Sequence, residues 1–329
     1  MIYDVHAHCI PADLVTWMED RGHQVGIDVE RVDGKSRVVF DGRYRTAPLR
    51  ADLTDPALRI ETMDRTGIDV QVLASWIDLT GYQLEPDLGL EWSKALNEIL
   101  AAEAATAPDR FVAIGSVPLQ NPSAAAEELR RITQDLGMKG VEIATTVDEG
   151  ALDLADLDEF WAAAAELGSF VLLHPMAPLP GVDLDRYFLD NMVGRPAEST
   201  IAFAGLLFDG VFERHPDLTM CVVHGGGFVP FQVGRFNQGY RQKPGLAGKN
   251  LAMEPLDYIK RNVYVDTVLN EPAVLRFLVD LLGSDRILVG TDYPFEMGDL
   301  DPVEFVRSAG IAEGDVEAIL TTNAARLLG

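Results

Sequence analysis

The sequence predicts an α/β fold, a (β/α)₈ TIM barrel with a small β insertion after its first strand, in a single domain over residues 1–329. Eight short runs rich in β-branched residues alternate with stretches of helical periodicity. Histidines and one aspartate stand at the ends of several runs, where the catalytic residues of such barrels lie. A chain of 329 residues is long enough for one such barrel.

The expected strands are apolar along most of their length, as parallel strands buried on both faces should be. They span residues 2–8, 70–75, 111–117, 140–145, 170–175, 220–225, 263–267 and 287–294. Eight strand–helix units favour a closed barrel over an open sheet.

Amphipathic stretches between these runs predict the helices of the outer layer. The clearest span residues 55–67, 89–105, 122–137, 157–168 and 271–283. Several end in glycine, which the left-handed position after a helix prefers.

Two segments do not fit the strand–helix alternation. Residues 9–54 contain QVGIDVERVDGKSRVVFDGRY, which alternates as strands do around a DGK turn, and predict the β insertion on the active-site side. Residues 176–196 are rich in Pro, Gly and Asp, and predict a lid or wall over the site.

The charge balance excludes some partners. With 27 Lys and Arg against 52 Asp and Glu, the net charge of −25 repels nucleic acid and anionic membranes. No segment approaches the roughly 20 apolar residues of a membrane span. An anionic small-molecule substrate needs a local cationic group.

Cysteine content and the start of the chain indicate a cytoplasmic protein. Cys9 and Cys221 alone make no disulfide framework. The opening MIYDVHAH lacks the basic start and the long apolar stretch of a signal peptide.

Metal-capable side chains close four of the expected strands. His6 and His8 close the first, His174 the fifth, His224 the sixth and Asp292 the eighth. Residues i and i+2 of a strand share a face, so the first pair can offer two imidazoles to one ion. Imidazole and carboxylate ligands favour Zn²⁺, with Mn²⁺, Co²⁺ or Fe²⁺ as alternatives.

His224 is expected beside the metal as a proton-transfer group, although a role as fifth ligand stays open. It lies between an apolar run and GGG, where small residues allow close approach. His23 and His215 lie in polar segments and are expected to be solvated. Glu142, in the middle of a strand, faces either the barrel interior or a structural partner.

Several motifs resemble the amidohydrolase-2 family, most closely its branch around 2-amino-3-carboxymuconate-6-semialdehyde decarboxylase. They are DVHAH, LLHPMAP, VVHGGG followed by PFQVGR, and GTDYPF, with further likeness over 55–73 and 117–122. The resemblance implies one divalent metal, usually zinc, on His6, His8, His174 and Asp292. It implies that His224 is the acid/base residue, with Asp292 also in the catalytic set.

The resemblance also implies how a substrate carboxylate is bound. Arg235 matches an arginine that reaches the neighbouring subunit's site, which predicts a homodimer. Arg45 is the nearest counterpart of a second arginine, with Arg43 or Arg50 as alternatives, and Phe295 in GTDYPF is expected beside the substrate. The segment 176–196 lacks the tryptophan that the decarboxylases have there. This departure bears on which substrate is bound and not on the metal site.

Related barrels with two metals bridge them by a modified lysine at the end of strand 4. Here that strand reads GVEIAT and Lys139 precedes it, which favours a single metal.

The predicted function is non-oxidative decarboxylation of an unsaturated or aromatic carboxylate, such as a carboxymuconate semialdehyde or an ortho-hydroxybenzoate. A hydrolase of lactone, amide or C–C bonds could use the same metal site, because fold does not choose the reaction. A metal-stabilised barrel without catalytic activity is the third alternative.

Overall fold

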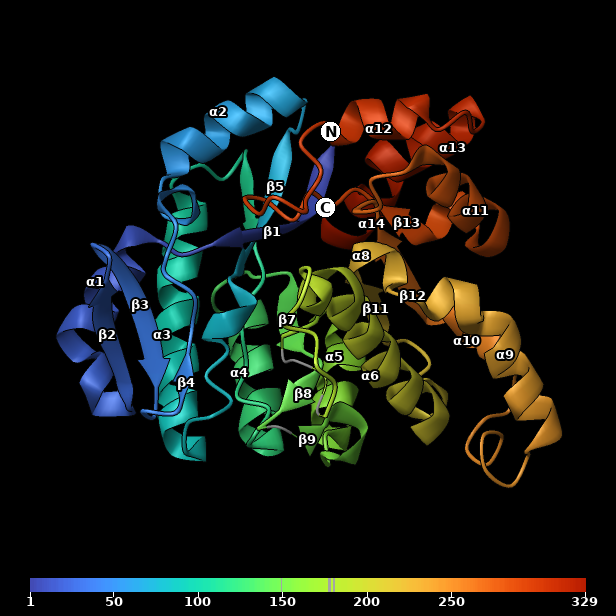
Figure 1. Ribbon diagram of the computed structural model, residues 1–329, viewed down its shortest axis with the longest axis horizontal. Helices are drawn as coiled ribbons and strands as arrows, with labels where there is room; N and C mark the ends of the chain where they lie inside the picture. Colours follow the sequence, from blue (N-terminus) through green and yellow to red (C-terminus); the bar gives the residue numbers. More distant parts are fainter. Residues whose placement is uncertain (149, 177–178, 180) are drawn as a thin grey trace.

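Eight parallel strands form the centre of the protein in a computed structural model that describes residues 1–148, 150–176, 179 and 181–329 (Figure 1). Each predicted run overlaps one of them. The strands are β1 (Tyr3–Cys9), β5 (Val70–Ser75), β6 (Phe111–Ala113), β7 (Gly140–Ala144), β10 (Phe170–His174), β11 (Thr219–Val222), β12 (Val263–Asp266) and β13 (Ile287–Leu288).

The barrel closes through two short junctions. Parallel ladders join β1 to β5 and β6, and join β7 through β10, β11 and β12 to β13. Gly115 pairs with Val141 at one junction and Ala7 with Tyr293 at the other. Val5 N–H donates to Val289 O at 2.9 Å across the second junction. The (β/α)₈ barrel is therefore confirmed.

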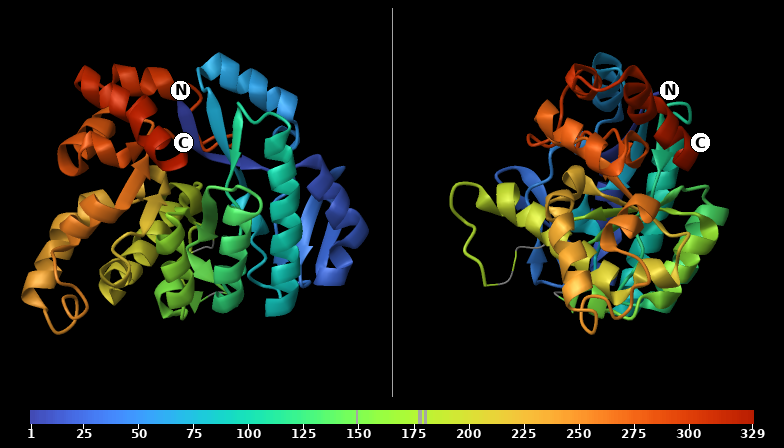
Figure 2. Two further views of the ribbon diagram at one scale, coloured as in Figure 1. Left: turned by 180° about the vertical axis from the view of Figure 1, so that it is seen from behind. Right: turned by 90° about the vertical axis from the view of Figure 1, so that its right-hand side faces the viewer.

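Helices cover the outside of the strands, as Figure 2 shows from two further sides. The five predicted helices are present, and proline occupies the first turn of four of them, where its missing N–H costs nothing. The helices are α2 (Pro56–Thr66), α3 (Pro86–Ala105), α4 (Pro122–Gln134), α5 (Asp158–Leu167), α6 (Arg195–Asp209), α7 (Val211–Arg214), α8 (Val223–Gly226), α9 (Val229–Gln242), α10 (Pro255–Asn262), α11 (Pro272–Leu282), α12 (Pro302–Ser308), α13 (Glu313–Glu317) and α14 (Asn323–Leu328). Short 3₁₀ or π turns lie at Gly22–Val25, Ala51–Leu53, Ile77–Leu79, Leu152–Leu154, Asp190–Gly194, Ser284–Arg286 and Ala318–Thr322.

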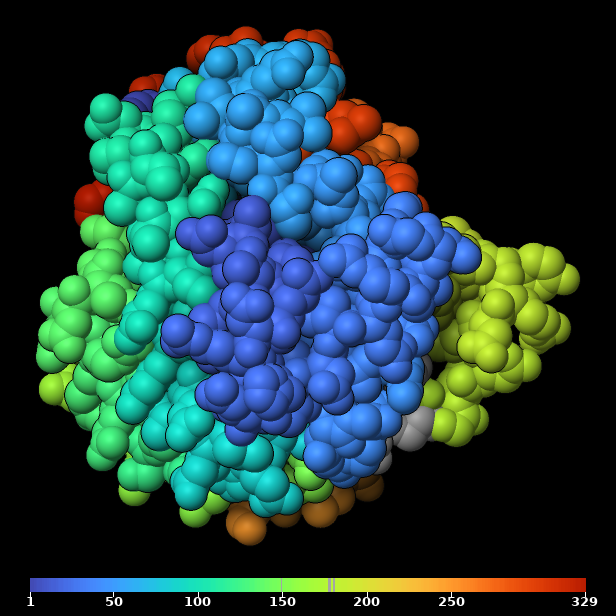
Figure 3. All heavy atoms as spheres, turned by 90° about the vertical axis from the view of Figure 1, so that its left-hand side faces the viewer, coloured from blue at the N-terminus to red at the C-terminus, as the bar shows by residue number. Residues whose placement is uncertain are grey.

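The insertion after β1 contains the predicted strands and one helix that the sequence pattern did not predict. α1 (Ala12–Arg21) precedes an antiparallel sheet of β2 (Ile27–Val32), β3 (Lys35–Phe40) and β4 (Tyr44–Arg45). Asp33 and Gly34 both have positive φ in the two-residue turn between β2 and β3, as a type I′ hairpin requires. The insertion packs beside α3 and covers the face seen in Figure 3.

Apolar side chains form two separate clusters. Alternate strand residues such as Val5, Val72 and Leu172 fill the barrel, where Leu328 of α14 joins them. The larger cluster lies between the strands and the surrounding helices. This layered core fixes the strand ends from which the site is built.

The segment after β10 projects from the barrel. Residues 181–194 extend away from the body in Figures 2 and 3, and Tyr187 and Phe188 are 79% and 52% exposed. Ala177, Pro178 and Pro180, part of the predicted lid or wall, lie outside the described residues. A small hairpin of β8 (Thr146–Val147) and β9 (Gly150–Ala151) follows β7. None of the described helices is both long and apolar enough to span a membrane.

Candidate active site

The five residues predicted at strand ends converge at one end of the barrel, and we call them the His/Asp centre. His6 and His8 lie on β1, His174 ends β10, and His224 and Asp292 follow β11 and β13. The ring centroid of His174 lies 5.1 Å from that of His6 and 4.9 Å from that of His8. One potential ligand atom from each of His6, His174, His224 and Asp292 lies within 4.8 Å of the others.

The orientation of two imidazoles leaves unpaired nitrogens facing the centre. His6 Nδ1 lies 2.7 Å from Asp266 Oδ2, and His174 Nδ1 lies 2.8 Å from Pro175 O. Because only an N–H donates to an oxygen of this kind, Nδ1 of each ring carries a proton, and Nε2 is the nitrogen that can offer a lone pair to a metal. Both Nε2 atoms are buried without a hydrogen-bond partner among the described residues. Such lone pairs suit a divalent cation.

Asp292 is the shared carboxylate of the centre. Its Oδ1 lies 3.2 Å from His8 Nε2 and 3.4 Å from His6 Nε2, and its Oδ2 lies 3.7 Å from His224 Nε2. Asp292 and His224 both have φ of 56°, a left-handed conformation that costs a non-glycine residue of order 1–3 kcal/mol. Surrounding hydrogen bonds hold them there, including Asp292 N–H to His6 O at 2.8 Å.

Electrostatics couple the members of the centre. Burial opposes ionisation of Asp292, but the neighbouring imidazoles of His224, His6 and His8 hold its pKa well below the usual range. Burial opposes protonation of His6, yet the neighbouring carboxylates of Asp266 and Asp292 keep its pKa well above the usual value. Burial and the neighbouring imidazoles lower the pKa of His174 well below its usual value. The centre therefore combines a retained carboxylate at Asp292, a neutral imidazole at His174 and, at His6, a protonated ring whose proton a bound cation would replace.

Asp266 belongs to this network and was not singled out from the sequence. It ends β12, and its Oδ1 accepts a hydrogen bond from Gly225 N–H at 2.8 Å while Oδ2 faces His6. A carboxylate behind a metal-binding histidine fixes the tautomer and orientation of the ring. The rule that functional residues close barrel strands applies equally to VYVD and could have found it.

Glu142 faces the barrel interior, which was one of the two alternatives left open. Its Oε1 lies 3.7 Å from His8 Nδ1 and has no hydrogen-bond partner in the described part of the chain. Burial raises the pKa of Glu142 to about 7, against the opposing effect of His8 and His6. A ligand atom of Glu142 also lies within 4.8 Å of those of His8 and His174.

The predicted substrate-binding residues differ in their distance from the centre. The ring of Phe295 meets His8 edge-on at 5.4 Å, and the guanidinium carbon of Arg50 lies 5.9 Å from the Phe295 centroid. Arg45 is directed within the insertion, where it donates to Gly42 O at 3.0 Å. Arg235 lies exposed on α9.

The other two histidines and the remaining insertion arginine are outside the centre. His23 is exposed, and His215 Nε2 pairs with Asp158 Oδ1 at 2.9 Å. Arg43 donates to Gln83 O at 2.8 Å. Of the three insertion arginines considered, Arg50 is the one that lies over the ring of Phe295, which in turn meets His8.

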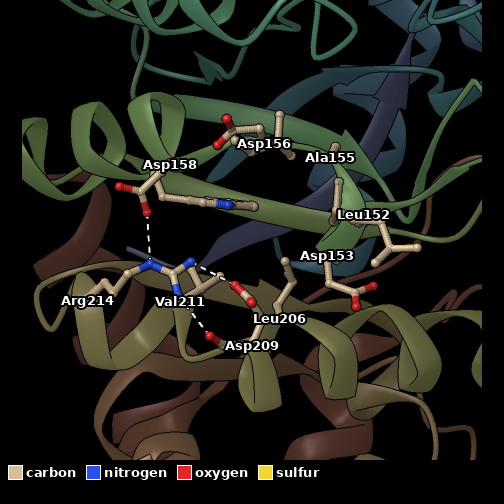
Figure 4. Close-up of a pocket in the computed structure, with 12 residues that line it drawn as sticks. Leu152, Asp153, Ala155, Asp156, Asp158, Leu206, Asp209, Val211 and Arg214 are labelled. Carbon is tan, nitrogen blue, oxygen red and sulfur yellow. Dashed lines mark hydrogen bonds and ion pairs between the residues drawn. The ribbon is translucent and has the colours of Figure 1, made fainter. Parts of the chain in front are cut away.

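A surface hollow between α5, α6 and α7 is separate from the centre. Figure 4 shows Arg214 there between Asp158 and Asp209, which it pairs with at 2.9 and 2.7 Å. None of the residues that line it belongs to the His/Asp centre.

Sequence comparison decides the family. A family model described as Amidohydrolase matches residues 3–329. The chain belongs to the amidohydrolase family. The resemblance in the sequence motifs is thereby confirmed over nearly the whole length.

Relatives of this amidohydrolase are decarboxylases. The 2-amino-3-carboxymuconate-6-semialdehyde decarboxylase of Dictyostelium discoideum is 32% identical over 328 residues, covering 99% of this chain and 91% of the relative. A γ-resorcylate decarboxylase from a Rhizobium species is 32% identical over 287 residues, covering 82% and 85%.

A solved structure shares the fold of this amidohydrolase. The dihydroxybenzoic acid decarboxylase of a Polaromonas species superposes with a TM-score of 0.81 at 24% identity, covering 100% of this chain and 97% of the other. That structure holds manganese and the inhibitor 2-nitroresorcinol. Its relatives identify this amidohydrolase as a metal-dependent decarboxylase. Its cluster of histidines and an aspartate is able to bind a metal ion.

Proposed function

We propose that this enzyme removes CO₂, without oxidation, from an unsaturated or aromatic carboxylate such as a carboxymuconate semialdehyde or an ortho-hydroxybenzoate. The observation that carries the proposal is the convergence of imidazole nitrogens and the Asp292 carboxylate at one end of the barrel. The names of two relatives, each 32% identical to this chain, support these substrate classes.

The proposed cofactor is one divalent cation on His6, His8, His174 and Asp292, with zinc as first choice and manganese as second. The manganese of the Polaromonas structure supports a divalent metal. When bound, the cation supplies a fixed positive charge that stabilises the electron density left behind by departing CO₂.

His224 is the proposed proton donor. In the reaction the bond to the carboxylate carbon breaks, its electron pair stays on the substrate carbon, and that carbon takes up a proton as CO₂ leaves. The side chain of His224 is 19% exposed whereas His6 and His8 are fully buried, so His224 is the more accessible to a substrate. Proton transfer of this kind contributes typically ~10²–10⁴-fold.

The test measures metal content and CO₂ release from 2,6-dihydroxybenzoate and from 2-amino-3-carboxymuconate 6-semialdehyde. We expect His224→Ala to keep its metal and to lose ~10²–10⁴-fold in turnover. His174→Ala should lose the metal, and His23→Ala, in the exposed insertion, should match the parent protein. Unchanged turnover in His224→Ala contradicts the assigned role.

Product analysis separates the alternatives. A new carboxylic acid without CO₂ supports a hydrolase. A stoichiometric metal without turnover of any carboxylate supports a barrel that is not catalytic.

We also propose a homodimer in which Arg235 binds the substrate carboxylate in the partner's site. Arg235 lies four residues after Phe231 on α9, so the two share a helix face. Phe231 is 80% exposed and Ile201 of the adjacent α6 is 60% exposed, an apolar surface that a second copy would cover.

Mixing two inactive variants tests the shared site. In mixed dimers of Arg235→Ala with His224→Ala, one site keeps both residues only if Arg235 acts across the interface. Random exchange should then restore about a quarter of the parent activity. No recovery, together with a monomeric parent protein in sedimentation, would remove the cross-subunit role.

Finally, we propose that residues 1–329 form a single domain in the cytoplasm. The closure of β1 against the chain at Tyr293 supports one domain, because it joins both ends of the sequence. Two buried free thiols, Cys9 and Cys221, support a reducing compartment.

A further inference from the structure

Asp4 is a fully buried carboxylate of β1 that lies outside the His/Asp centre. Its Oδ1 accepts hydrogen bonds from the backbone N–H of Thr291 at 3.0 Å and from that of His6 at 3.2 Å. Its Oδ2 accepts from Gln71 Nε2 at 2.7 Å and from the Thr291 hydroxyl at 2.6 Å. An ionised carboxylate has about four acceptor sites, so donors surround Asp4 on both oxygens.

Thr291 precedes Asp292 in the sequence, and both of its polar groups donate to Asp4. Because the hydroxyl proton is directed to Asp4, the lone pairs of that hydroxyl face elsewhere. They accept the backbone N–H of Tyr293 at 3.1 Å. The side chain of Thr291 therefore closes a turn around Asp292, as threonine hydroxyls do when they accept from the N–H two residues further on.

This turn holds Asp292 in the conformation that directs its carboxylate into the centre. The φ of Asp292 is 56°, and its N–H donates to His6 O at 2.8 Å. β13 already ends at Leu288, so the ladder of that strand does not fix the backbone at Asp292. The bonds between Thr291 and Asp4 tie the turn to β1, the strand that carries His6 and His8.

Asp4 is also held from a second side. Gln71 of β5 donates to it, and Arg59 Nη1 donates to Gln71 Oε1 at 2.7 Å, which fixes the end of the amide that faces Asp4. The guanidinium carbon of Arg59 lies 4.8 Å from the ring centroid of Tyr293. These contacts close on themselves around the turn, and we call the buried set Asp4, Gln71, Arg59, Tyr293 and Thr291 the Asp4 network.

We propose that Asp4 is a positioning residue of the His/Asp centre, which acts through Thr291 to hold the Asp292 carboxylate beside the histidines. The inference rests on the proposed function, because it assumes that Asp292 binds the divalent cation. None of the Asp4 hydrogen bonds in the described part of the chain reaches a metal-binding atom, so its effect on the metal passes through the turn.

Chelator competition on the Co²⁺-loaded protein tests the proposal, and the visible absorption of the same samples reports the ligands around Co²⁺. We expect Asp4→Asn and Thr291→Val each to lower the affinity by ~10–100-fold, the range for residues that orient a metal ligand. Both should also change the visible spectrum, because the Asp292 carboxylate moves. Thr291→Ser keeps the hydroxyl and should retain the affinity and the spectrum of the parent protein.

The double variant Asp4→Asn/Thr291→Val separates the turn from the charge of Asp4. Both residues act through the same bonds, so the double variant should lose little more affinity than either single variant. Fully additive losses would mean two independent effects, such as removal of a buried charge near the metal, and would overturn the proposal.

Val306→Ala is the control for loss of stability alone. Val306 is a fully buried residue of α12 outside both the Asp4 network and the His/Asp centre. Its truncation should lower the melting temperature and leave the affinity and the spectrum unchanged.

Thr291→Val decides the test if Asp4→Asn does not fold, because it keeps the buried charge. An affinity and a spectrum equal to the parent's in Thr291→Val overturn the proposal, as does an equal loss in Thr291→Ser. Weaker metal binding in Thr291→Val, in a protein that releases CO₂ from no carboxylate, would refute the proposed function and leave the positioning role standing.

Discussion

The guanidinium of Arg59 donates from Nη2 to the backbone oxygen of His8 at 2.5 Å. Arg59 belongs to α2 and is only 2% exposed, so the outer helix layer is tied directly to a strand residue of the His/Asp centre. A second bond, from Nη1 to Gln71 Oε1 at 2.7 Å, joins the same side chain to β5.

Replacement of Arg59 should therefore destabilise the barrel. In Arg59→Met two buried oxygens lose their donor, and we expect the free energy of unfolding to fall by ~2–4 kcal/mol in urea titrations. Arg65→Met, at an exposed position of the same helix, should stay within ~0.5 kcal/mol of the parent. Equal effects of the two changes would show that the bond to His8 contributes nothing.

Asp266→Asn should weaken metal binding. The change keeps the shape of the side chain but removes the charge that orients His6 through Nδ1. Loss of such a partner typically costs ~10–100-fold in metal affinity, which competition with a chelator would measure. Asp257→Asn, on the exposed side of α10, is the matched control. An affinity equal to the parent's would rule out this role for Asp266.

Glu142 predicts a pH dependence of stability in the metal-free protein. Its pKa rises from 4.5 to about 7 on folding, so its contribution is fully present below pH 4.5 and is lost as pH rises through about 7. Glu142→Gln does not ionise and should gain up to ~3 kcal/mol relative to the parent between pH 5 and pH 8.

Unfolding of EDTA-treated protein at several pH values measures this difference. Glu127→Gln, on the exposed face of α4, should follow the parent at every pH. Parallel curves for the parent and Glu142→Gln would contradict the prediction.

Gly140 is required where β7 meets β10. A Cβ at this position would lie 1.8 Å from the backbone oxygen of Phe170, a contact that neither strand can relieve without breaking the pairing. We expect Gly140→Ala to lower the unfolding free energy by more than ~3 kcal/mol. Gly314→Ala, with open space around it in α13, should be neutral or stabilising by up to ~1 kcal/mol. Thermal unfolding of both variants and the parent protein measures these differences. Similar melting temperatures for both would count against the close packing.

The strands could be predicted from the sequence because each is buried on both faces and reads as an apolar run. The last was expected to reach residue 294, but β13 ends at Leu288. Beyond it the chain adopts a left-handed conformation at Asp292, which directs that carboxylate toward His6 and His8. A conformation imposed by tertiary contacts leaves no periodic signal.

Helix α1 was missed for a different reason. Only Leu14 and Met18 of its ten residues are buried, so its apolar periodicity is weak. The histidines of the centre could be predicted from their strand-end positions, whereas the hydrogen bond from Arg59 to His8 depends on how α2 packs against β1. Spacing along the chain contains no information on that contact.

The contact between His8 and Asp292 joins residues 284 positions apart. During synthesis the histidines therefore emerge long before the carboxylate they meet, and a chain still on the ribosome cannot assemble the full set. The proposed metal loading on the complete set therefore requires synthesis beyond Asp292, and a C-terminal truncation before Asp292 would have the imidazoles without their shared anion.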